Sequence, residues 1–167
     1  MSGVSIRPST LADAPAILAL HLAAASRGGG LAREPDEMSL EPIQAVLAKA
    51  LASGVALSAW SDGAIAGEIH ASRLGPRQFD NSLTELTVAV HPDFQGQGVG
   101  AQLFEALFAK ARTLAGITRV ELMCREGNTR AVRLYQRLGF VIEGRFIRRV
   151  VLANGTVEDD LAMAKFL

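Results

Sequence analysis

The segment that most constrains the fold of this chain is a strand that passes through a glycine-rich turn straight into a long helix. The pattern predicts a strand over Leu83–Val90, glycines gather in Gln95–Gly100, and apolar residues at helical spacing follow over Gly98–Ala115. Glycines let such a turn tighten and let a ligand approach the backbone. The unpaired N–H groups of a first helical turn, together with the helix dipole, form an anion site. The segment therefore predicts a bound phosphate, most of all a pyrophosphate.

The patterns on either side of this segment predict a mixed α/β chain. Further strands are expected over 4–7, 55–60, 64–74, 119–123, 140–152 and 157–166. Further helices are expected over 14–26, 40–53 and 129–138. The order is strand, two helices, three strands, helix, strand, helix, two strands, which favours helices packed on one layer of sheet. No repeat or linker divides the chain, so residues 1–167 are expected to form a single domain.

Composition and charge exclude several classes of protein. Lys plus Arg equals Asp plus Glu at 17 each, whereas binding to a nucleic-acid backbone needs a basic excess, so no nucleic-acid partner is expected. No apolar stretch reaches about 18 residues, so no membrane span is expected. The single cysteine, Cys124, excludes an intrachain disulfide and a paired-cysteine metal site, and no metal is expected. One cysteine, and a beginning without an apolar secretory signal, favour a cytoplasmic protein.

Two classes of cofactor site fit the glycine turn. Gly96-x-Gly98-x-x-Ala101 matches the dinucleotide fingerprint of nicotinamide and flavin enzymes. That fingerprint normally follows the first strand of its unit, whereas about 95 residues precede the turn here. It also needs an acidic residue at the end of the next strand, and the nearest candidate, Glu121, lies inside that strand pattern.

The second class rests on a resemblance that extends beyond the turn. Gln95-x-x-Gly98-x-Gly100 resembles the Q/R-x-x-G-x-G/A loop of the GNAT acyltransferases, and Asn128-x-x-Ala131-x-x-Leu134-Tyr135-x-x-x-Gly139-Phe140 resembles their second cofactor segment. The ending Glu143-Gly144, Asn154-Gly155 and Asp160–Met163 resembles the closing hairpin of many members. The order of elements agrees over nearly the whole chain, so the chain is identified as similar to this superfamily.

The resemblance implies a fold and an activity. The fold is a mixed sheet of about seven strands with four helices, in which two parallel strands, Leu83–Val90 and Arg119–Met123, splay apart in the middle. The activity is direct transfer of an acetyl group from acetyl-CoA to a primary amine. The closing hairpin is similar to the branch that acts on free amino acids or similar small molecules. A protein N-terminal or lysine acetyltransferase, and a non-catalytic module that binds CoA, are the alternatives.

The resemblance also implies which residues contact the cofactor. They lie on the first splayed strand, on the glycine turn and on the helix after Asn128: Val88, Ala89, Val90, Gln95, Gly96, Gln97, Gly98, Val99, Gly100, Ala101, Asn128, Ala131, Tyr135 and Arg137. The pantetheine arm is expected to pair with the free backbone of the splayed strand. An N–H near Val88 is expected to polarise the thioester carbonyl.

Tyr135 and Glu85 are the catalytic residues that the resemblance implies. Tyr135 matches the family tyrosine that protonates the leaving thiolate; a phenol has a pKa of about 10 and a thiol of about 8.5. Tyr135 also lies on an apolar helical stripe, so a core position is the alternative. Glu85 is expected to act as a base or to hold a water, and alternation places it on one strand face with Thr87 and Ala89.

The acceptor amine is expected between 27–40 and 146–157. Arg27 and Arg33 are candidates to bind a carboxylate, because guanidinium groups match one. Glu68 and His70 are candidates to line the acceptor pocket, and His21 is predicted to be structural. Dimers are common in the family, which leaves a homodimer as a possible assembly.

Overall fold

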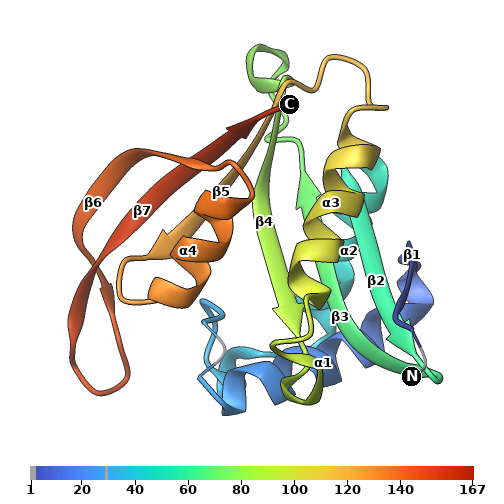
Figure 1. Cartoon of the computed structure of the whole chain (residues 1–167), viewed down its shortest axis with the longest axis horizontal. Coiled ribbons are helices and arrows are strands. Elements are labelled where there is room, and N and C mark those ends of the chain that lie inside the picture. Colours follow the sequence, from blue (N-terminus) through green and yellow to red (C-terminus); the bar gives the residue numbers. More distant parts are fainter. Residues whose placement is uncertain (1–2, 29) are drawn as a thin grey trace.

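The computed structural model describes residues 3–28 and 30–167, and its strands form one seven-stranded sheet in the order β1-β2-β3-β4-β5-β7-β6 (Figure 1). The strands are β1 (Ser5–Pro8), β2 (Val55–Ser61), β3 (Ala64–Ser72), β4 (Ser82–Val90), β5 (Arg119–Arg125), β6 (Val141–Val151) and β7 (Val157–Phe166). The α-helices are α1 (Ala14–Ser26), α2 (Leu40–Ser53), α3 (Val99–Ala111) and α4 (Thr129–Arg137). The predicted order of elements is confirmed.

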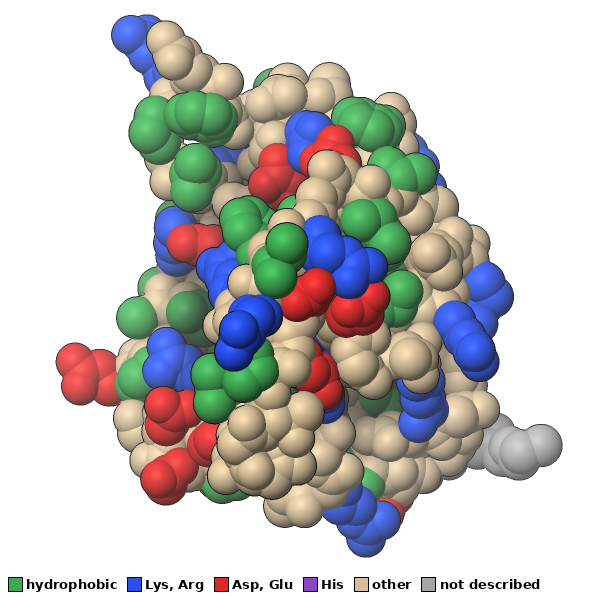
Figure 2. Space-filling view, turned by 90° about the vertical axis from the view of Figure 1, so that its left-hand side faces the viewer, with side chains coloured by type: hydrophobic (Ala, Val, Ile, Leu, Met, Phe, Trp, Pro, Cys, Tyr) green, Lys and Arg blue, Asp and Glu red, His purple; other side chains and the backbone are tan. Residues whose placement is uncertain are grey.

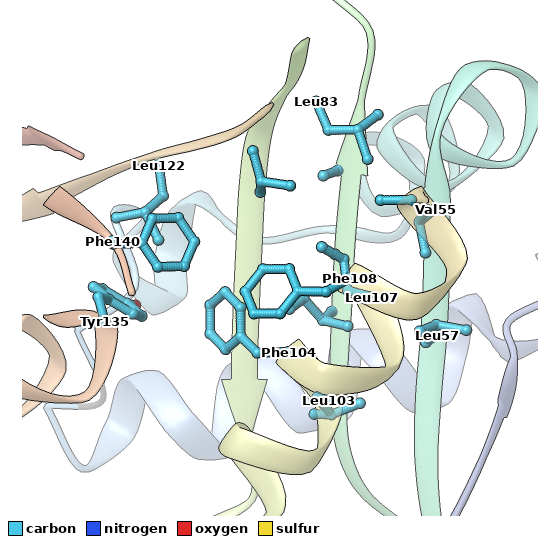
Figure 3. Close-up of a cluster of buried hydrophobic side chains, with 14 of the residues drawn as sticks. Val55, Leu57, Leu83, Leu103, Phe104, Leu107, Phe108, Leu122, Tyr135 and Phe140 are labelled. Carbon is cyan, nitrogen blue, oxygen red and sulfur yellow. The ribbon is translucent and has the colours of Figure 1, made fainter. Parts of the chain in front are cut away.

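The helices cover both faces of the strands β2–β4. Helix α3 lies on one face, and α1 and α2 lie on the other (Figure 1). The apolar side chains of α3 recur every three or four residues, which places Leu103, Phe104, Leu107 and Phe108 against the sheet, where they are fully buried. Figure 3 shows these side chains pointing toward the strands, with Tyr135 and Phe140 approaching from the side of α4.

Strands β4 and β5 form the only parallel pair between the described strands, and they separate almost at once. They pair at Ser82↔Arg119 and Leu83↔Val120 and then diverge, which Figure 1 shows as a widening gap between the two ribbons. The rest of β4 is paired with β3 alone. The splayed parallel strands that the sequence implied are therefore confirmed.

A bulge changes the alternation of β4. The register between β3 and β4 shifts between His70 and Ser72, and Glu85 on the opposite strand has a positive φ of 53°. Leu83 and Val88 lie an odd number of positions apart, so regular alternation would place them on opposite faces of the strand. Because of the bulge, both pack on the same core. After the bulge, one face of β4 carries apolar side chains toward α3 and α4, and the other face meets α1 and α2.

One helix and one strand end earlier than the sequence predicts. Helix α3 ends at Ala111 instead of Ala115, because the Thr113 hydroxyl donates a hydrogen bond to the Lys110 carbonyl and Gly116, at φ 78°, turns the chain back toward β5. Strand β3 ends at Ser72 instead of Leu74, just beyond the bulge. Among the residues that the structure describes, no helix is long and apolar enough to cross a membrane.

Candidate active site

A cavity of about 480 Å³ opens between the glycine turn, the beginning of α4 and the end of α1. Its lining is Arg27, Gly28, Val90, Phe94, Gln95, Gly96, Gly98, Val99, Gly100, Ala101, Asn128, Arg130, Ala131, Leu134 and Arg137. The N-termini of two helices, α3 and α4, therefore border one space. Both ends present N–H groups and positive dipole ends to it, which is the environment that an anion needs.

The turn in front of α3 is fixed by backbone conformation and by its own side chains. Gly96 and Gly98 have φ values of 78° and 83°, a left-handed conformation that side chains disfavour, and Gly98 is the residue that caps α3. The Gln95 side-chain amide donates to the Val90 carbonyl at 3.2 Å, and that of Gln97 donates to the Asp93 carbonyl at 2.8 Å. Among the residues that the structure describes no side chain caps α3, so its first N–H groups border the cavity without a side-chain acceptor.

The opposite wall is built around the start of α4. The Asn128 side-chain oxygen accepts a hydrogen bond from the Ala131 N–H at 3.3 Å, so Asn128 caps this helix and lines the cavity at the same time. Three arginines surround the space: Arg27, Arg130 and Arg137. Within the described residues none of the three pairs with a carboxylate, which leaves their charge available to a ligand.

The structure brings most of the residues implied for the cofactor to this cavity and leaves some outside its lining. Those that line it are Val90, Gln95, Gly96, Gly98, Val99, Gly100, Ala101, Asn128, Ala131 and Arg137. Those that do not are Val88, Ala89, Gln97 and Tyr135. Phe94 and Arg130 also line the cavity, and the sequence did not predict either of them.

Tyr135 lies among aromatic rings. Its ring centroid is 5.5 Å from that of Phe104 and 5.9 Å from that of Phe140 (Figure 3). Burial, followed by the nearby Cys124, raises the pKa of Tyr135 well above that of a free phenol. The hydroxyl therefore stays protonated near neutral pH and keeps a proton that it can donate in a hydrogen bond.

Glu85 lies on the α2 side of β4, beside the bulge. Its carboxylate is 2.5 Å from the Lys49 ammonium and accepts a hydrogen bond from the Ser72 hydroxyl at 2.9 Å. The hydrogen bond from Lys49 is the largest cause that lowers the pKa of Glu85. Half of the side chain is exposed, and it lines neither of the two cavities described here.

A second cavity, of about 130 Å³, lies between α1, α2 and the strands β3 and β4. Its lining is His21, Leu31, Ala32, Arg33, Glu37, Met38, Ser39, Pro42, Ile43, Val46, His70 and Thr87. The chain that follows α1 contributes to both spaces: Arg27 and Gly28 line the first cavity, and Leu31 and Arg33 line the second.

A buried carboxylate joins two histidines beside this second cavity. Glu68 is fully buried, and its two oxygens lie 2.6 Å from His21 Nε2 and 3.1 Å from His70 Nδ1. Burial works to raise the pKa of Glu68, but the two imidazoles outweigh it and lower that pKa. Burial likewise works to lower the pKa of His70, and the charge of Glu68 outweighs it and raises that pKa. In the described part of the chain no group of His, Cys, Asp and Glu is arranged to hold a metal ion.

Two members of this cluster, Glu68 and His70, were predicted to line the acceptor pocket, and the third, His21, was not assigned to it. Glu68 and His70 alternate on one strand, which is the signal that placed them on a common face. His21 lies in an apolar helical run and was predicted to be structural; its position opposite Glu68 depends on how α1 crosses β3, which no local pattern records.

Comparison with known proteins identifies the family. Residues 31–140 match the model of the Acetyltransferase (GNAT) family. The chain is 32% identical over 145 residues to the L-methionine sulfoximine/L-methionine sulfone acetyltransferase of Pseudomonas aeruginosa, an alignment that covers 84% of this chain and 82% of that one. The match excludes the nicotinamide and flavin alternative for the glycine turn.

Solved structures show the same fold. The ribosomal-protein-alanine N-acetyltransferase from Brucella melitensis superimposes with a TM-score of 0.84 at 27% identity, covering 98% of this chain and 99% of that one. A putative acetyltransferase from Salmonella typhimurium, solved with its cofactor acetyl-CoA, superimposes with a TM-score of 0.86 at 24% identity, covering 99% and 95%.

The fold, the cavity between two helix N-termini and these matches define the class of the protein. The chain belongs to the GNAT acetyltransferase family. It is an acetyl-CoA-dependent N-acetyltransferase.

Proposed function

We propose that the acceptor is a free amino acid or a similarly small zwitterion, acetylated on its primary amine. The observation that carries this proposal is the second cavity. A space of about 130 Å³ suits a small molecule and not a peptide segment, and it holds both an arginine, Arg33, and a carboxylate, Glu37. A zwitterion offers one partner to each, since a guanidinium matches a carboxylate and an acidic side chain matches an ammonium group. The relative from Pseudomonas aeruginosa, named for two amino-acid derivatives, supports this choice.

The donor would occupy the first cavity. Its diphosphate fits the N–H groups at the starts of α3 and α4 and the free charge of Arg27, Arg130 and Arg137. The pantetheine arm would follow β4 beyond Leu83, where β5 no longer pairs with it. This path leads from Val90, which lines the first cavity, to Thr87, which lines the second.

The chemistry proposed for the site needs three functions from the chain. A backbone N–H near Val88 would bind the oxygen of the thioester carbonyl as it becomes negative. Tyr135 would hydrogen-bond to the leaving sulfur and supply its proton; the raised pKa keeps that proton on the hydroxyl until the sulfur becomes negative. Glu85 as base or water-holder stays a prediction; its pairing with Lys49 and lowered pKa favour holding a water over accepting a proton.

The exposed edge of the sheet supports a homodimer, an assembly that the sequence left open. Strand β6 is an edge strand, and its exposed apolar side chains include Ile142, Phe146, Ile147 and Val151. Figure 2 shows hydrophobic side chains interspersed with charged ones on the face of the molecule that lies on the left in Figure 1. The single domain over residues 1–167 and the cytoplasmic location also stay predictions.

Release of free thiol from acetyl-CoA, measured with a panel of amines, tests the proposed acceptor. The panel should contain free amino acids, methionine sulfone among them, a peptide with an N-terminal alanine, and spermidine. Amino acids should give the highest kcat/KM, and Arg33→Gln should raise KM for them without changing the Kd of acetyl-CoA. Turnover confined to the peptide would favour the protein N-terminal acetyltransferase. Acetyl-CoA binding with no thiol release for any amine would favour the non-catalytic module.

A further inference from the structure

The cluster of Glu68, His21 and His70 uses one nitrogen of each imidazole and leaves the other. His70 meets the carboxylate through Nδ1, so its Nε2 remains; His21 meets it through Nε2, so its Nδ1 remains. Among the described residues no protein group bonds to either remaining nitrogen, and neither belongs to the buried atoms that lack a partner, so solvent reaches both. Both histidines line the second cavity.

A carboxylate bound to one imidazole nitrogen fixes the tautomer of the ring. The bonded nitrogen carries the proton, and the other nitrogen keeps its lone pair. His70 is the better placed of the two rings, because it lies on β3 directly opposite Thr87 of β4. Thr87 lines the second cavity and is adjacent in sequence to Val88, near which the thioester carbonyl is proposed to lie. His21 approaches from α1, on the other side of the carboxylate.

Resting on the function proposed above, we infer that His70 accepts the proton of the acceptor's ammonium group, with Glu68 positioning its ring and His21 holding the second oxygen of Glu68. The ammonium group gives one proton to Nε2 of His70, and the nitrogen lone pair then forms a bond to the thioester carbonyl carbon. The tetrahedral intermediate breaks its C–S bond. The thiolate leaves as free thiol with a proton from Tyr135, which regains one from the acetylated nitrogen. His70 returns its proton to solvent, so each turnover releases one proton.

The charges around His70 decide when it can act. Glu68 on the same strand and Glu85 on β4 both raise the pKa of His70. The other charged or titratable groups that face it across the cavity are His21 of α1 and Arg33 and Glu37 of the chain between α1 and α2. A raised pKa makes the imidazole a stronger base, because it brings the pKa of His70 closer to that of the ammonium group. It also means that a higher pH is needed before the ring is neutral and can accept a proton. The rate should therefore rise with pH along a limb set by His70.

The first test compares two variants that each remove one imidazole from the same carboxylate. His70→Gln should lower kcat about 10²-fold, the usual contribution of a positioned base, and should abolish the ascending limb of kcat against pH. His21→Gln, the matched control, should keep that limb and lose less than about tenfold. Acetyl-CoA affinity and thermal melting, measured on both, show whether the fold and donor site are intact. Equal losses in the two variants with an unaltered pH profile would overturn the inference.

Three further measurements do not depend on the stability of His70→Gln. In the wild-type enzyme, kcat must rise with pH through one ionisation above the ordinary pKa of histidine, because Glu68 raises the pKa of His70, and a profile without this rise overturns the inference. Glu68→Gln should shift this limb to lower pH, because the charge that raises the pKa of His70 is gone. Added imidazole should restore turnover to His70→Ala and not to His21→Ala; rescue of neither variant counts against His70 as the base.

Failure of this inference is distinguishable from failure of the proposed function. A wild-type enzyme that acetylates no amino acid refutes the proposed acceptor. A wild-type enzyme that acetylates amino acids while Glu85→Gln, and not His70→Gln, removes the ascending limb refutes only the assignment of the base.

Discussion

Tyr135 is a buried residue with two properties: its ring packs between aromatic rings, and burial keeps the proton on its hydroxyl. Tyr135→Phe keeps the ring and its packing and removes only that proton. We expect kcat to fall about 10²-fold with the Kd of acetyl-CoA and the melting temperature unchanged. Steady-state kinetics with calorimetric titration of acetyl-CoA would check this. An unaltered kcat would assign Tyr135 to the core alone.

Asp13 gives a pH dependence of stability that is independent of catalysis. It accepts hydrogen bonds from Arg7 at 2.8 Å and from the Thr10 N–H at 2.7 Å. The hydrogen bond from Arg7 is the main cause that lowers the pKa of Asp13 from 3.8 to about 2. A depressed pKa stabilises the folded chain above the unfolded pKa, and this stabilisation is lost as pH falls through about 2.

Asp13→Asn should therefore lower the free energy of unfolding by about 1–2 kcal/mol at pH 7, after allowance for the exposed Arg7, and by much less near pH 2. Urea unfolding at several pH values would check this. The variant Asp36→Asn, for which no hydrogen bond or ion pair is described, serves as the control. A loss that is the same at both pH values would point to packing instead of charge.

At the scale of elements, the turn before α3 depends on backbone geometry that glycine supplies. Gly98 has a left-handed φ of 83°, and the space around an added Cβ is open apart from the Gln102 side chain at 3.8 Å. Gly98→Ala should cost about 1–2 kcal/mol of strain. Gly98→Asp should cause the same backbone strain and, in addition, place a negative charge at the start of α3.

We expect Gly98→Asp to weaken acetyl-CoA binding at least about tenfold beyond Gly98→Ala, the matched control, because the carboxylate repels a diphosphate. Binding measured by calorimetry at two salt concentrations would check this, since salt screens the repulsion and should reduce the difference in acetyl-CoA affinity between the two variants. Equal affinities in the two variants would move the diphosphate away from this helix.

The sequence predicted elements more reliably than side-chain neighbours. The strand, glycine turn and helix around Gly98 could be predicted because apolar spacing and glycine placement are local signals. Asn128 could be predicted because its cap is three residues from its partner Ala131. His21 could not, since its partner Glu68 is 47 positions away on another element. The pairing of Glu85 with Lys49 could not be predicted for the same reason. The bulge at Glu85 could not be predicted either, because no glycine or other turn-forming residue marks its position in the sequence.

At the scale of the whole molecule, acetyl-CoA would bind between two parts of the sheet that share few backbone bonds. Ligand binding to the folded state alone stabilises it by mass action, and a concentration of about 100 times Kd contributes about 2.7 kcal/mol. For a chain of 167 residues this corresponds to a rise in melting temperature of about 5–10 °C. Thermal melting with and without acetyl-CoA would check this. Pantetheine, which lacks the diphosphate, should raise the melting temperature clearly less at equal concentration. An equal rise in melting temperature would show that the diphosphate does not contribute to binding.

Because β4 separates early from β5, the amides and carbonyls on the β5-facing edge of β4 have no partner strand beyond Leu83. A donor bound there, as proposed above, would be recognised by backbone atoms, which every residue type carries. Side-chain substitutions along β4 would then leave these backbone contacts with the donor intact, while they change the shape of the pocket that the amine enters. A lineage built on this framework is thus free to change what it acetylates while keeping what it acetylates with.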